Sequence, residues 1–165
     1  MKNAVHTVLA IGGNLGDREA NIRAAVEKID AIKKVKVRAL SPLVESYAVT
    51  SAGIDQSKPN YINAVVKADT SLKPKKFLKK LRAVEAELGR VRLERWGSRT
   101  MDIDIITYGD EIISKKSLTV PHPRAFQRAF VLVPWNLIDA DAVLPGHGKV
   151  AELAKVVEKD VWVVS

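Results

Sequence analysis

The spacing of hydrophobic residues changes several times in the first half of the chain and predicts a strand, a helix and a further strand. Residues 4–11 are rich in β-branched and apolar side chains and lead into the turn-forming sequence GGNLGD, in which Asp17 can cap a following helix. From Ile22 onward an apolar residue recurs at i, i+4 and i+7, which is the stripe of an amphipathic helix. Residues 35–49 then favour a strand that a Ser-Pro pair interrupts, because proline cannot donate to a strand ladder.

The middle of the chain alternates again between strand and helix patterns. The polar residues 50–60 are typical of a loop. Residues 61–68 alternate so that Tyr61, Asn63 and Val65 share one face of a strand. A helix is predicted to begin at Pro74, to continue to Leu88 and to end at a glycine cap.

A last strand is predicted over residues 101–108, with Gly109-Asp110 turning the chain into a short hairpin partner at residues 112–113. The order strand, helix, strand, strand, helix, strand is that of a ferredoxin-like βαββαβ core. We therefore predict an α+β fold, in which helices pack on one face of an antiparallel sheet and the C-terminal residues add to it. One domain over residues 1–165 is expected from this length.

Composition narrows the class of protein without naming a function. The 27 Lys and Arg against 19 Asp and Glu give a net charge of +8, which suits nucleic acid, an anionic surface or a phosphate-rich ligand equally well. The chain has no cysteine, which excludes thiolate nucleophiles and Cys-based zinc sites. Because no apolar run reaches 18 residues and the N-terminus does not resemble a signal sequence, we expect a cytoplasmic protein that binds no membrane.

Two carboxylates stand in the strand DIDII, although strands usually avoid aspartate. Alternation places Asp102 and Asp104 on one face, about 7 Å apart at Cα, with Ile103 and Ile105 on the other. Two like charges at this separation repel and favour a cation beside them. Carboxylates together with substrate phosphates are the usual ligands of Mg²⁺, although a D-x-D pair is often only a solvated edge-strand feature.

An arginine cluster precedes these carboxylates in the sequence GRVRLERWGSRT. Arg90, Arg92, Arg95 and Arg99 surround Trp96 and two glycines. The planar guanidinium fork matches phosphate oxygens, and glycines allow a loop to close over a ligand. A solvated basic face is the alternative interpretation, but it requires neither the tryptophan nor the nearby carboxylates.

Glu85 is the one acidic residue that falls inside the apolar stripe of the second predicted helix, when about 100° per residue is counted from Phe77. A carboxylate in that position must pair with a cation or face a polar cavity, because burying it unpaired is costly. A pair with a neighbouring arginine and a ligand-binding role both remain open.

Two other groups of residues are weaker candidates. Tyr61 and Asn63 share a strand face that suits a flat heterocycle, since the ring can stack while the amide both donates and accepts hydrogen bonds. His122 lies between two prolines, close in sequence to Arg128 and Phe130, but a His-Pro loop needs no function.

Taken in order, the motifs IGGNLGD, NYINAVV, GRVRLERWGSRTMDIDI and LTVPHPR resemble the 6-hydroxymethyl-7,8-dihydropterin pyrophosphokinase family over residues 8–140. The chain also lacks the G-x-x-x-x-G-K-[ST] loop and the G-x-G-x-x-G spacing of other nucleotide sites. The resemblance implies Mg²⁺-dependent transfer of pyrophosphate from ATP to the hydroxymethyl group of the pterin, a step of folate biosynthesis. It also implies two Mg²⁺ ions, a monomer and no nucleic-acid partner.

The resemblance assigns a role to each matching residue. Asp102 and Asp104 would bind both metal ions, and Arg90 and Arg99 would contact the transferring phosphates. The ATP site would comprise Glu85, Arg92, Trp96, Ile105, Thr119, His122 and Arg128. The pterin would contact Thr50, Tyr61, Asn63, Trp96 and Phe130, with its ring between Tyr61 and Phe130.

Two positions depart from the family pattern. The prolines that commonly follow the pterin-loop threonine are replaced in TSAGIDQ, so contacts beyond Thr50 are not carried over. The basic residue that often precedes LTVPH is Ser117 here, and Lys115 or Lys116 could replace its phosphate contact.

Two other functions are weighed against this resemblance. A basic ferredoxin-like RNA-binding module would explain the charge, but only 5% of the residues are aromatic and no run resembles K/R-G-F-x-F. A D-x-D nuclease would explain the carboxylates, but it would not need the ring pocket of Tyr61, Asn63 and Phe130.

Overall fold

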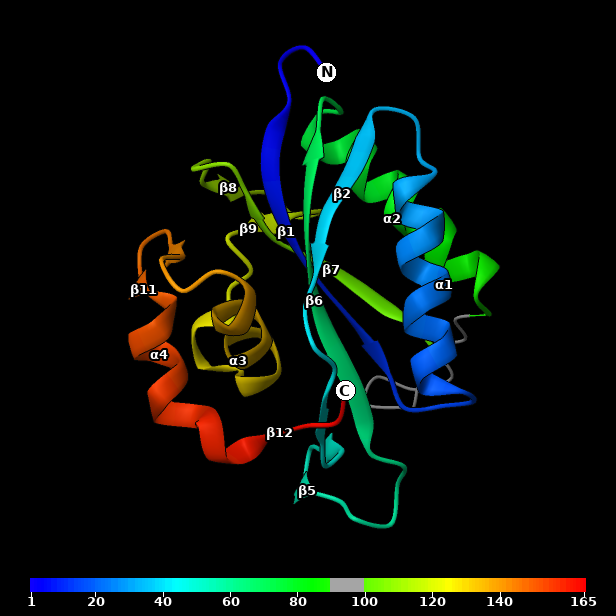
Figure 1. Cartoon of the computed structure of the whole chain (residues 1–165), viewed down its shortest axis with the longest axis vertical. Coiled ribbons are helices and arrows are strands. Elements are labelled where there is room, and N and C mark those ends of the chain that lie inside the picture. The colour runs from blue at the N-terminus through cyan, green and yellow to red at the C-terminus, as the bar shows by residue number, and fades with distance from the viewer. Residues whose placement is uncertain (90–99) are drawn as a thin grey trace.

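An antiparallel sheet runs through the centre of the molecule, and helices cover both of its faces (Figure 1). The computed structural model describes residues 1–89 and 100–165. In this part of the chain the sheet has six strands: β1 (Val5–Gly13), β2 (Val35–Leu40), β3 (Val44–Ser46), β6 (Tyr61–Thr70), β7 (Asp102–Tyr108) and β12 (Trp162–Val163). The helices are α1 (Arg18–Asp30), α2 (Pro74–Glu87), α3 (Ala129–Ile138) and α4 (Val150–Val157), with short 3-10 turns at Ala125–Gln127 and Glu158–Asp160.

The strand order confirms the predicted ferredoxin-like core. β1 lies between β6 and β7, while β2 and β3 pair in succession along the other edge of β6, and β12 adds to β3. All of these pairs are antiparallel. The predicted break between β2 and β3 is also confirmed. Ser41 bridges it, because its backbone N–H donates to the Val65 carbonyl and its hydroxyl accepts from the Val65 N–H.

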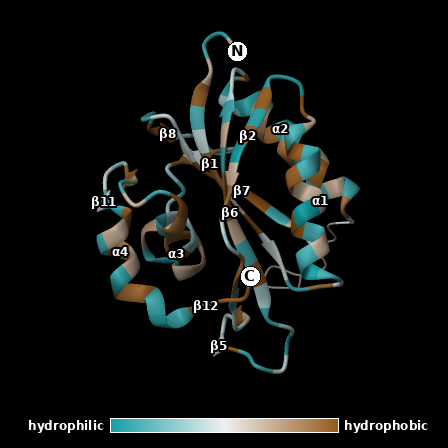
Figure 2. Cartoon of the chain, in the orientation of Figure 1, coloured by the Kyte–Doolittle hydropathy of each residue, from teal (hydrophilic) through white to brown (hydrophobic). Residues whose placement is uncertain are grey.

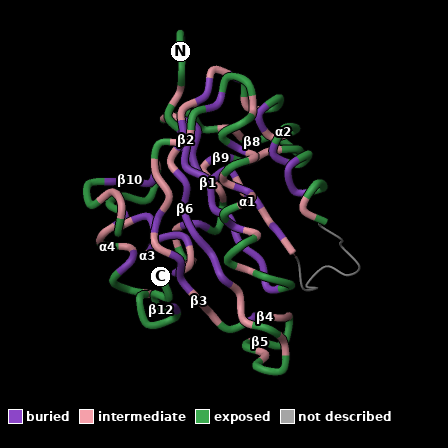
Figure 3. Tube along the Cα trace, turned by 45° about the vertical axis from the view of Figure 1, so that its right-hand side comes forward, coloured by how far each residue is buried: buried purple, intermediate pink, exposed green. Residues whose placement is uncertain are grey.

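Helices pack on both faces of the sheet, whereas the sequence predicted them on one. The predicted helices α1 and α2 share a core with the strand residues Leu9 and Ile103. The C-terminal helices α3 and α4 share a second core with Ala10 and Val65. Figure 3 shows the buried strands between these layers, and Figure 2 shows that hydrophilic residues make up much of α1 and α2. The two predicted helices therefore share one face, as expected, and the C-terminal additions, whose elements the sequence did not define, bury the other face with apolar sides of their own.

Several element boundaries differ from the sequence prediction. β1 continues through Gly13, and the predicted loop at 50–60 contains a small hairpin of β4 (Val49–Thr50) and β5 (Gly53–Ile54). The predicted cap is confirmed, since the Asp17 carboxylate accepts from the Ala20 N–H at 3.1 Å. Two more small hairpins pair β8 (Ile113–Ser114) with β9 (Thr119–Val120) and β10 (Val143–Leu144) with β11 (Gly148–Lys149).

The hairpin predicted between residues 101–108 and 112–113 is wrong. Ile113 of β8 pairs with Val120 of β9, not with β7. On the edge of β7 that faces away from β1, the backbone of Ile103 makes hydrogen bonds to the α2 side chains Arg82 and Glu85. No helix among the residues that the structure describes has the length and apolar character to cross a bilayer.

Candidate active site

One row of residues across the sheet brings an amide and a carboxylate to the same face. The Cα partner of Gly12 is Asn63 on one side and Asp102 on the other. Strands lie about 4.8 Å apart, so the Cα atoms of Asn63 and Asp102 are about 10 Å apart. In the next row Ala10 lies between Val65 and Asp104. Both rows have a small residue on β1 between the two side chains, Gly12 in the first and Ala10 in the second.

Gly12 has no space for a larger side chain. A Cβ atom there would lie 2.0 Å from Asn63 Oδ1 and 2.6 Å from the Ile62 carbonyl oxygen. The Asn63 side chain therefore lies directly over the backbone of Gly12. Sequence reasoning missed this residue by treating GGN as the start of a turn. A glycine inside a strand pattern is itself a signal of such close approach.

The carboxylate strand has the predicted alternation. Ile103 and Ile105 are buried on the α1 and α2 side, while Asp102 and Asp104 are partly exposed on the opposite face. Burial, followed by the charge of Asp102, raises the pKa of Asp104 to about 6, although Arg82 and Arg128 act in the other direction. Two repelling carboxylates are suited to a cation, as the sequence predicted.

A β-bulge in β7 connects this strand to the segment that carries His122. Val8 pairs with Thr107 and Leu9 pairs with Ile105, so Ile106 has no Cα partner on β1. The Ile106 carbonyl accepts the His122 N–H at 2.9 Å. The extra residue thus leaves an acceptor that ties His122 to the carboxylate strand.

A hollow of about 170 Å³ opens beside Asp104 between α2, β7 and the segment after β8. Four residues of the predicted site line it, namely Asp104, Ile105, Thr119 and His122. Leu78, Arg82, Ser117, Leu118 and Pro123 complete the lining. Ser117, the position that lacks the family's basic residue, lines the hollow, and Lys115 and Lys116, the two candidates to replace its phosphate contact, are exposed but are not among the lining residues.

The imidazole of His122 is neutral at pH 7. Burial and the charges of Arg128 and Arg124 lower its pKa to about 4. Its Nδ1 accepts the backbone N–H of Arg124 at 3.2 Å, so the neutral ring carries its proton on Nε2. The Nε2–H group of His122 is therefore an uncharged hydrogen-bond donor at the wall of the hollow.

Arg128 and Phe130 lie where the chain enters α3. The guanidinium carbon of Arg128 is 5.4 Å from the centre of the Phe130 ring. Arg128 is close enough to Asp102 and Asp104 for their charges to favour its protonated form, while burial lowers its pKa. Phe130, the second residue of α3, is half-buried and packs against the core that α3 and α4 share with the sheet.

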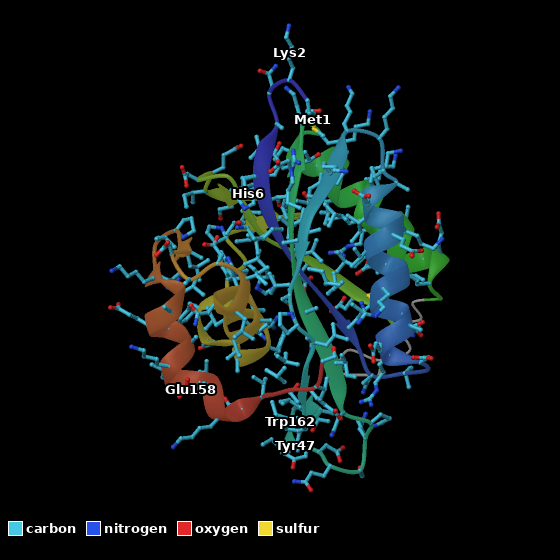
Figure 4. All side chains as sticks on the ribbon, in the orientation of Figure 1. Met1, Lys2, His6, Tyr47, Glu158 and Trp162 are labelled. Carbon is cyan, nitrogen blue, oxygen red and sulfur yellow. The ribbon has the colours of Figure 1, made fainter. Side chains whose placement is uncertain are left out.

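The residues predicted for the pterin end lie at the start of β6 and in the β4–β5 hairpin. Tyr61 is the first residue of β6 and is half-buried. The Thr50 hydroxyl accepts from the Ala52 N–H at 3.2 Å and donates to the Gly53 carbonyl at 3.3 Å. Tyr47 and Trp162 meet beside this hairpin, with ring centroids 5.2 Å apart (Figure 4).

Glu85 is buried in α2, with 1% of its surface exposed. Its Oε2 accepts the Ile103 N–H at 2.7 Å, and its Oε1 lies 2.9 Å from Nη1 of Arg82. The same Nη1 donates to the Ile103 carbonyl at 2.7 Å. A pair with a neighbouring arginine, left open by the sequence, is therefore present. Arg82 was not a predicted site residue, although its place one turn before Glu85 was a visible signal.

The arginine cluster Arg90, Arg92, Arg95, Trp96 and Arg99 lies outside the described residues. Within residues 1–89 and 100–165, no group of three or more His, Asp or Glu side chains could hold a metal ion. Asp102 and Asp104 are hard oxygen donors of the kind that Mg²⁺ prefers, and substrate phosphates would have to complete the coordination.

The raised pKa of Asp104 predicts a pH effect on stability. Between its ordinary value of 3.8 and about 6, the folded protein holds a proton that the unfolded chain has lost. Raising the pH through this window therefore lowers the free energy of unfolding, and the loss is complete above about 6. Urea unfolding without metal should show this decrease in the wild type relative to Asp104→Asn. Parallel pH curves for the two proteins would refute the raised pKa.

The chain matches known proteins over most of its length. Residues 8–140 match the family described as 7,8-dihydro-6-hydroxymethylpterin-pyrophosphokinase (HPPK). The chain is 43% identical over 143 residues to the 2-amino-4-hydroxy-6-hydroxymethyldihydropteridine pyrophosphokinase of Haemophilus influenzae, covering 82% of this chain and 87% of that one. The corresponding protein of Synechocystis is 39% identical over 142 residues, covering 86% and 70%.

A solved structure supports the same fold. The Plasmodium falciparum HPPK-DHPS with pteroate superposes with a TM-score of 0.72 at 13% identity, covering 95% of this chain and 43% of that chain. This chain thus spans less than half the length of that protein. The family match and the sequence identities together show that the chain belongs to the 7,8-dihydro-6-hydroxymethylpterin-pyrophosphokinase family.

Proposed function

We propose that the chain transfers pyrophosphate from ATP to 6-hydroxymethyl-7,8-dihydropterin and releases AMP, using the row Asn63, Gly12 and Asp102 as the centre of its site. Family membership supplies the reaction and its use of ATP. The observation that supports the assignment of residues is this row, in which an amide that can bond the edge of a heterocycle lies about 10 Å from a carboxylate that can hold a metal-phosphate group. The pterin and the ATP phosphates would meet above Gly12.

The pterin would bind at the Asn63 end. The Asn63 amide offers both a donor and an acceptor to the edge of the ring. Tyr61 shares its strand face and would stack on one side of the ring, with Phe130 on the other. Thr50 and Trp96 would complete this end of the site. The Thr50 hydroxyl would exchange its weak 3.3 Å bond to Gly53 for one to the pterin.

The nucleotide would occupy the hollow beside Asp104. Ile105 and Thr119 line it, and the neutral His122 can donate one hydrogen bond from Nε2. Arg128 adds a cation near the carboxylates. Arg92, Trp96 and Glu85 are also proposed to contact ATP. The burial of Glu85 limits such a contact to the edge of its carboxylate.

The proposed reaction requires the negative charge on the ATP phosphates to be neutralised. The hydroxymethyl oxygen of the pterin attacks the β-phosphorus of ATP, and the bond from that phosphorus to the α-phosphate oxygen breaks to release AMP. Two Mg²⁺ ions held by Asp102 and Asp104 would neutralise the phosphate oxygens and bring attacking and leaving oxygens into line. Arg90 and Arg99 would stabilise charge that develops on the transferring group. Asp102 or Asp104 would also accept the hydroxyl proton.

The function is tested by incubating the purified protein with ATP, Mg²⁺ and 6-hydroxymethyl-7,8-dihydropterin. Pterin-dependent AMP is the expected nucleotide product. ADP, or nucleotide turnover that does not require the pterin, would overturn the proposal. We further propose that residues 1–165 act as one domain and as a monomer, which sedimentation of the purified chain would test.

A further inference from the structure

We propose that Arg82 and Glu85 are positioning residues, which hold the backbone of Ile103 and thereby set the directions of the carboxylates on either side of it. The proposal rests on the assignment of Asp102 and Asp104 to the metal and phosphate site. This role is additional to the ATP contact proposed for Glu85 and to the place of Arg82 in the lining of the hollow, and it does not depend on either. We call this pair of side chains the α2 clamp.

The clamp bonds both backbone groups of one residue. Oε2 of Glu85 accepts the Ile103 N–H at 2.7 Å, and Nη1 of Arg82 donates to the Ile103 carbonyl at 2.7 Å. The two side chains also pair with each other at 2.9 Å. This arrangement copies the two hydrogen bonds that a neighbouring strand would make with one residue of an antiparallel ladder.

The position of β7 in the sheet explains why the clamp matters. In the described part of the sheet, β7 pairs with β1 on one side only. The backbone groups of successive residues point to opposite edges of a strand, so those of Asp102 and Asp104 face β1 while those of Ile103 face α2. The carboxylate strand is thus held from both edges within three residues.

Burial of the Glu85 carboxylate is consistent with this role. Glu85 lies among the buried residues Phe77, Leu81 and Val84 of α2, where an apolar residue would be the ordinary choice. A buried carboxylate costs less when a cation lies beside it and an N–H donates to it, as Arg82 does at 2.9 Å from Oε1 and Ile103 does to Oε2. The remaining acidic residue near the end of α2, Glu87, pairs with Lys28 on the surface at 2.9 Å.

Because side chains alternate along a strand, a small rotation of β7 at Ile103 would turn both carboxylates together. Displacements of about 1 Å can cost about 10²-fold in rate when a phosphoryl group must be held in line. Loss of the clamp should therefore weaken metal-dependent nucleotide binding and lower kcat, while the pterin end on β6 is unaffected.

The test compares Glu85→Ala, Glu85→Gln and Arg82→Met with the matched control Glu87→Gln, which breaks the exposed pair on the same helix. The first readout is exchange of the Ile103 amide hydrogen by NMR without ligand. The second is Mg²⁺-dependent binding of a non-hydrolysable ATP analogue by calorimetry. The third is kcat and the KM values for ATP and the pterin.

In Glu85→Ala, the Ile103 amide hydrogen should exchange at least about 10-fold faster than in the wild type. The Mg²⁺-dependent affinity for the ATP analogue should fall by about 10- to 100-fold. Glu85→Gln retains an acceptor for the Ile103 N–H, so its effect should be smaller, and Glu87→Gln should behave as wild type. If Glu85→Ala does not fold, Glu85→Gln and Arg82→Met carry the test.

Two results would overturn the clamp. One is faster Ile103 exchange with unchanged Mg²⁺-dependent binding and kcat. The other is a raised KM for ATP with unchanged kcat and unchanged Ile103 exchange, which would leave Glu85 only as a direct nucleotide contact. The exchange readout does not depend on the carboxylate assignment, so failure of that assignment is seen separately, as full activity in the aspartate variants described below.

Discussion

Replacing Asp102 or Asp104 with asparagine is expected to lower kcat for AMP formation by about 10²–10³-fold, the loss typical of one electrostatic stabiliser of a transition state. Asparagine has nearly the same shape as aspartate, so the face of β7 is kept while its charge is removed. The remaining carboxylate would hold Mg²⁺ and the ATP phosphates less well. Steady-state AMP formation and Mg²⁺-dependent binding of an ATP analogue both measure this loss.

The same variants should be at least as stable as the wild type without metal at pH 7. The charge of Asp104 is partly buried beside Asp102, and its removal relieves the repulsion that raises its pKa. Asp110→Asn, in the exposed turn after β7, is the matched control and should keep full activity. A variant at Asp102 or Asp104 with nearly normal turnover would remove these residues from the metal site.

Gly12→Ala is expected to lower the free energy of unfolding by about 1–3 kcal/mol, the usual cost of overpacking, and to abolish binding of the pterin. The added Cβ would lie 2.0 Å from Asn63 Oδ1 and 2.6 Å from the Ile62 carbonyl oxygen. The Asn63 side chain must therefore leave its position over β1, and the β1–β6 ladder must also move. Chemical denaturation and calorimetry with the pterin measure the two effects.

The double variant Gly12→Ala, Asn63→Ala separates the two clashes. Removing the Asn63 side chain relieves one of them, so the double variant should lose less stability than the sum of the single variants. Pterin binding should stay absent, because the amide is gone. Normal pterin affinity in Gly12→Ala would show that the row across the sheet is not the centre of the site.

Local patterns predicted the core elements and the shared faces of the site. The alternation in β7 placed both aspartates on one face, and the helical spacing placed Glu85 in the buried stripe of α2. The cap at Asp17 and the break at Ser41 were also predictable. Each of these depends on residues within a few positions of one another, where backbone geometry alone decides which side chains meet.

Features that depend on distant pairing were not predicted. The close approach of Asn63 to Gly12 joins residues of two different strands, and the glycine in the strand pattern signals a close approach without specifying its partner. The partner of β8 was wrong because Ile113 pairs with Val120 of β9, and the segment that follows β9 bonds β7 at Ile106 through the His122 N–H. The helices on the second face were missed because the last part of the sequence has no simple periodicity.

The bulge at Ile106 has a mechanical consequence. Its carbonyl joins the strand that carries Asp102 and Asp104 to His122 at the wall of the hollow. A shift of β7 at Ile106 is therefore expected to move the His122 backbone with it. A spectroscopic label on the segment around His122 would consequently report occupancy of the carboxylates, even though the label touches neither of them.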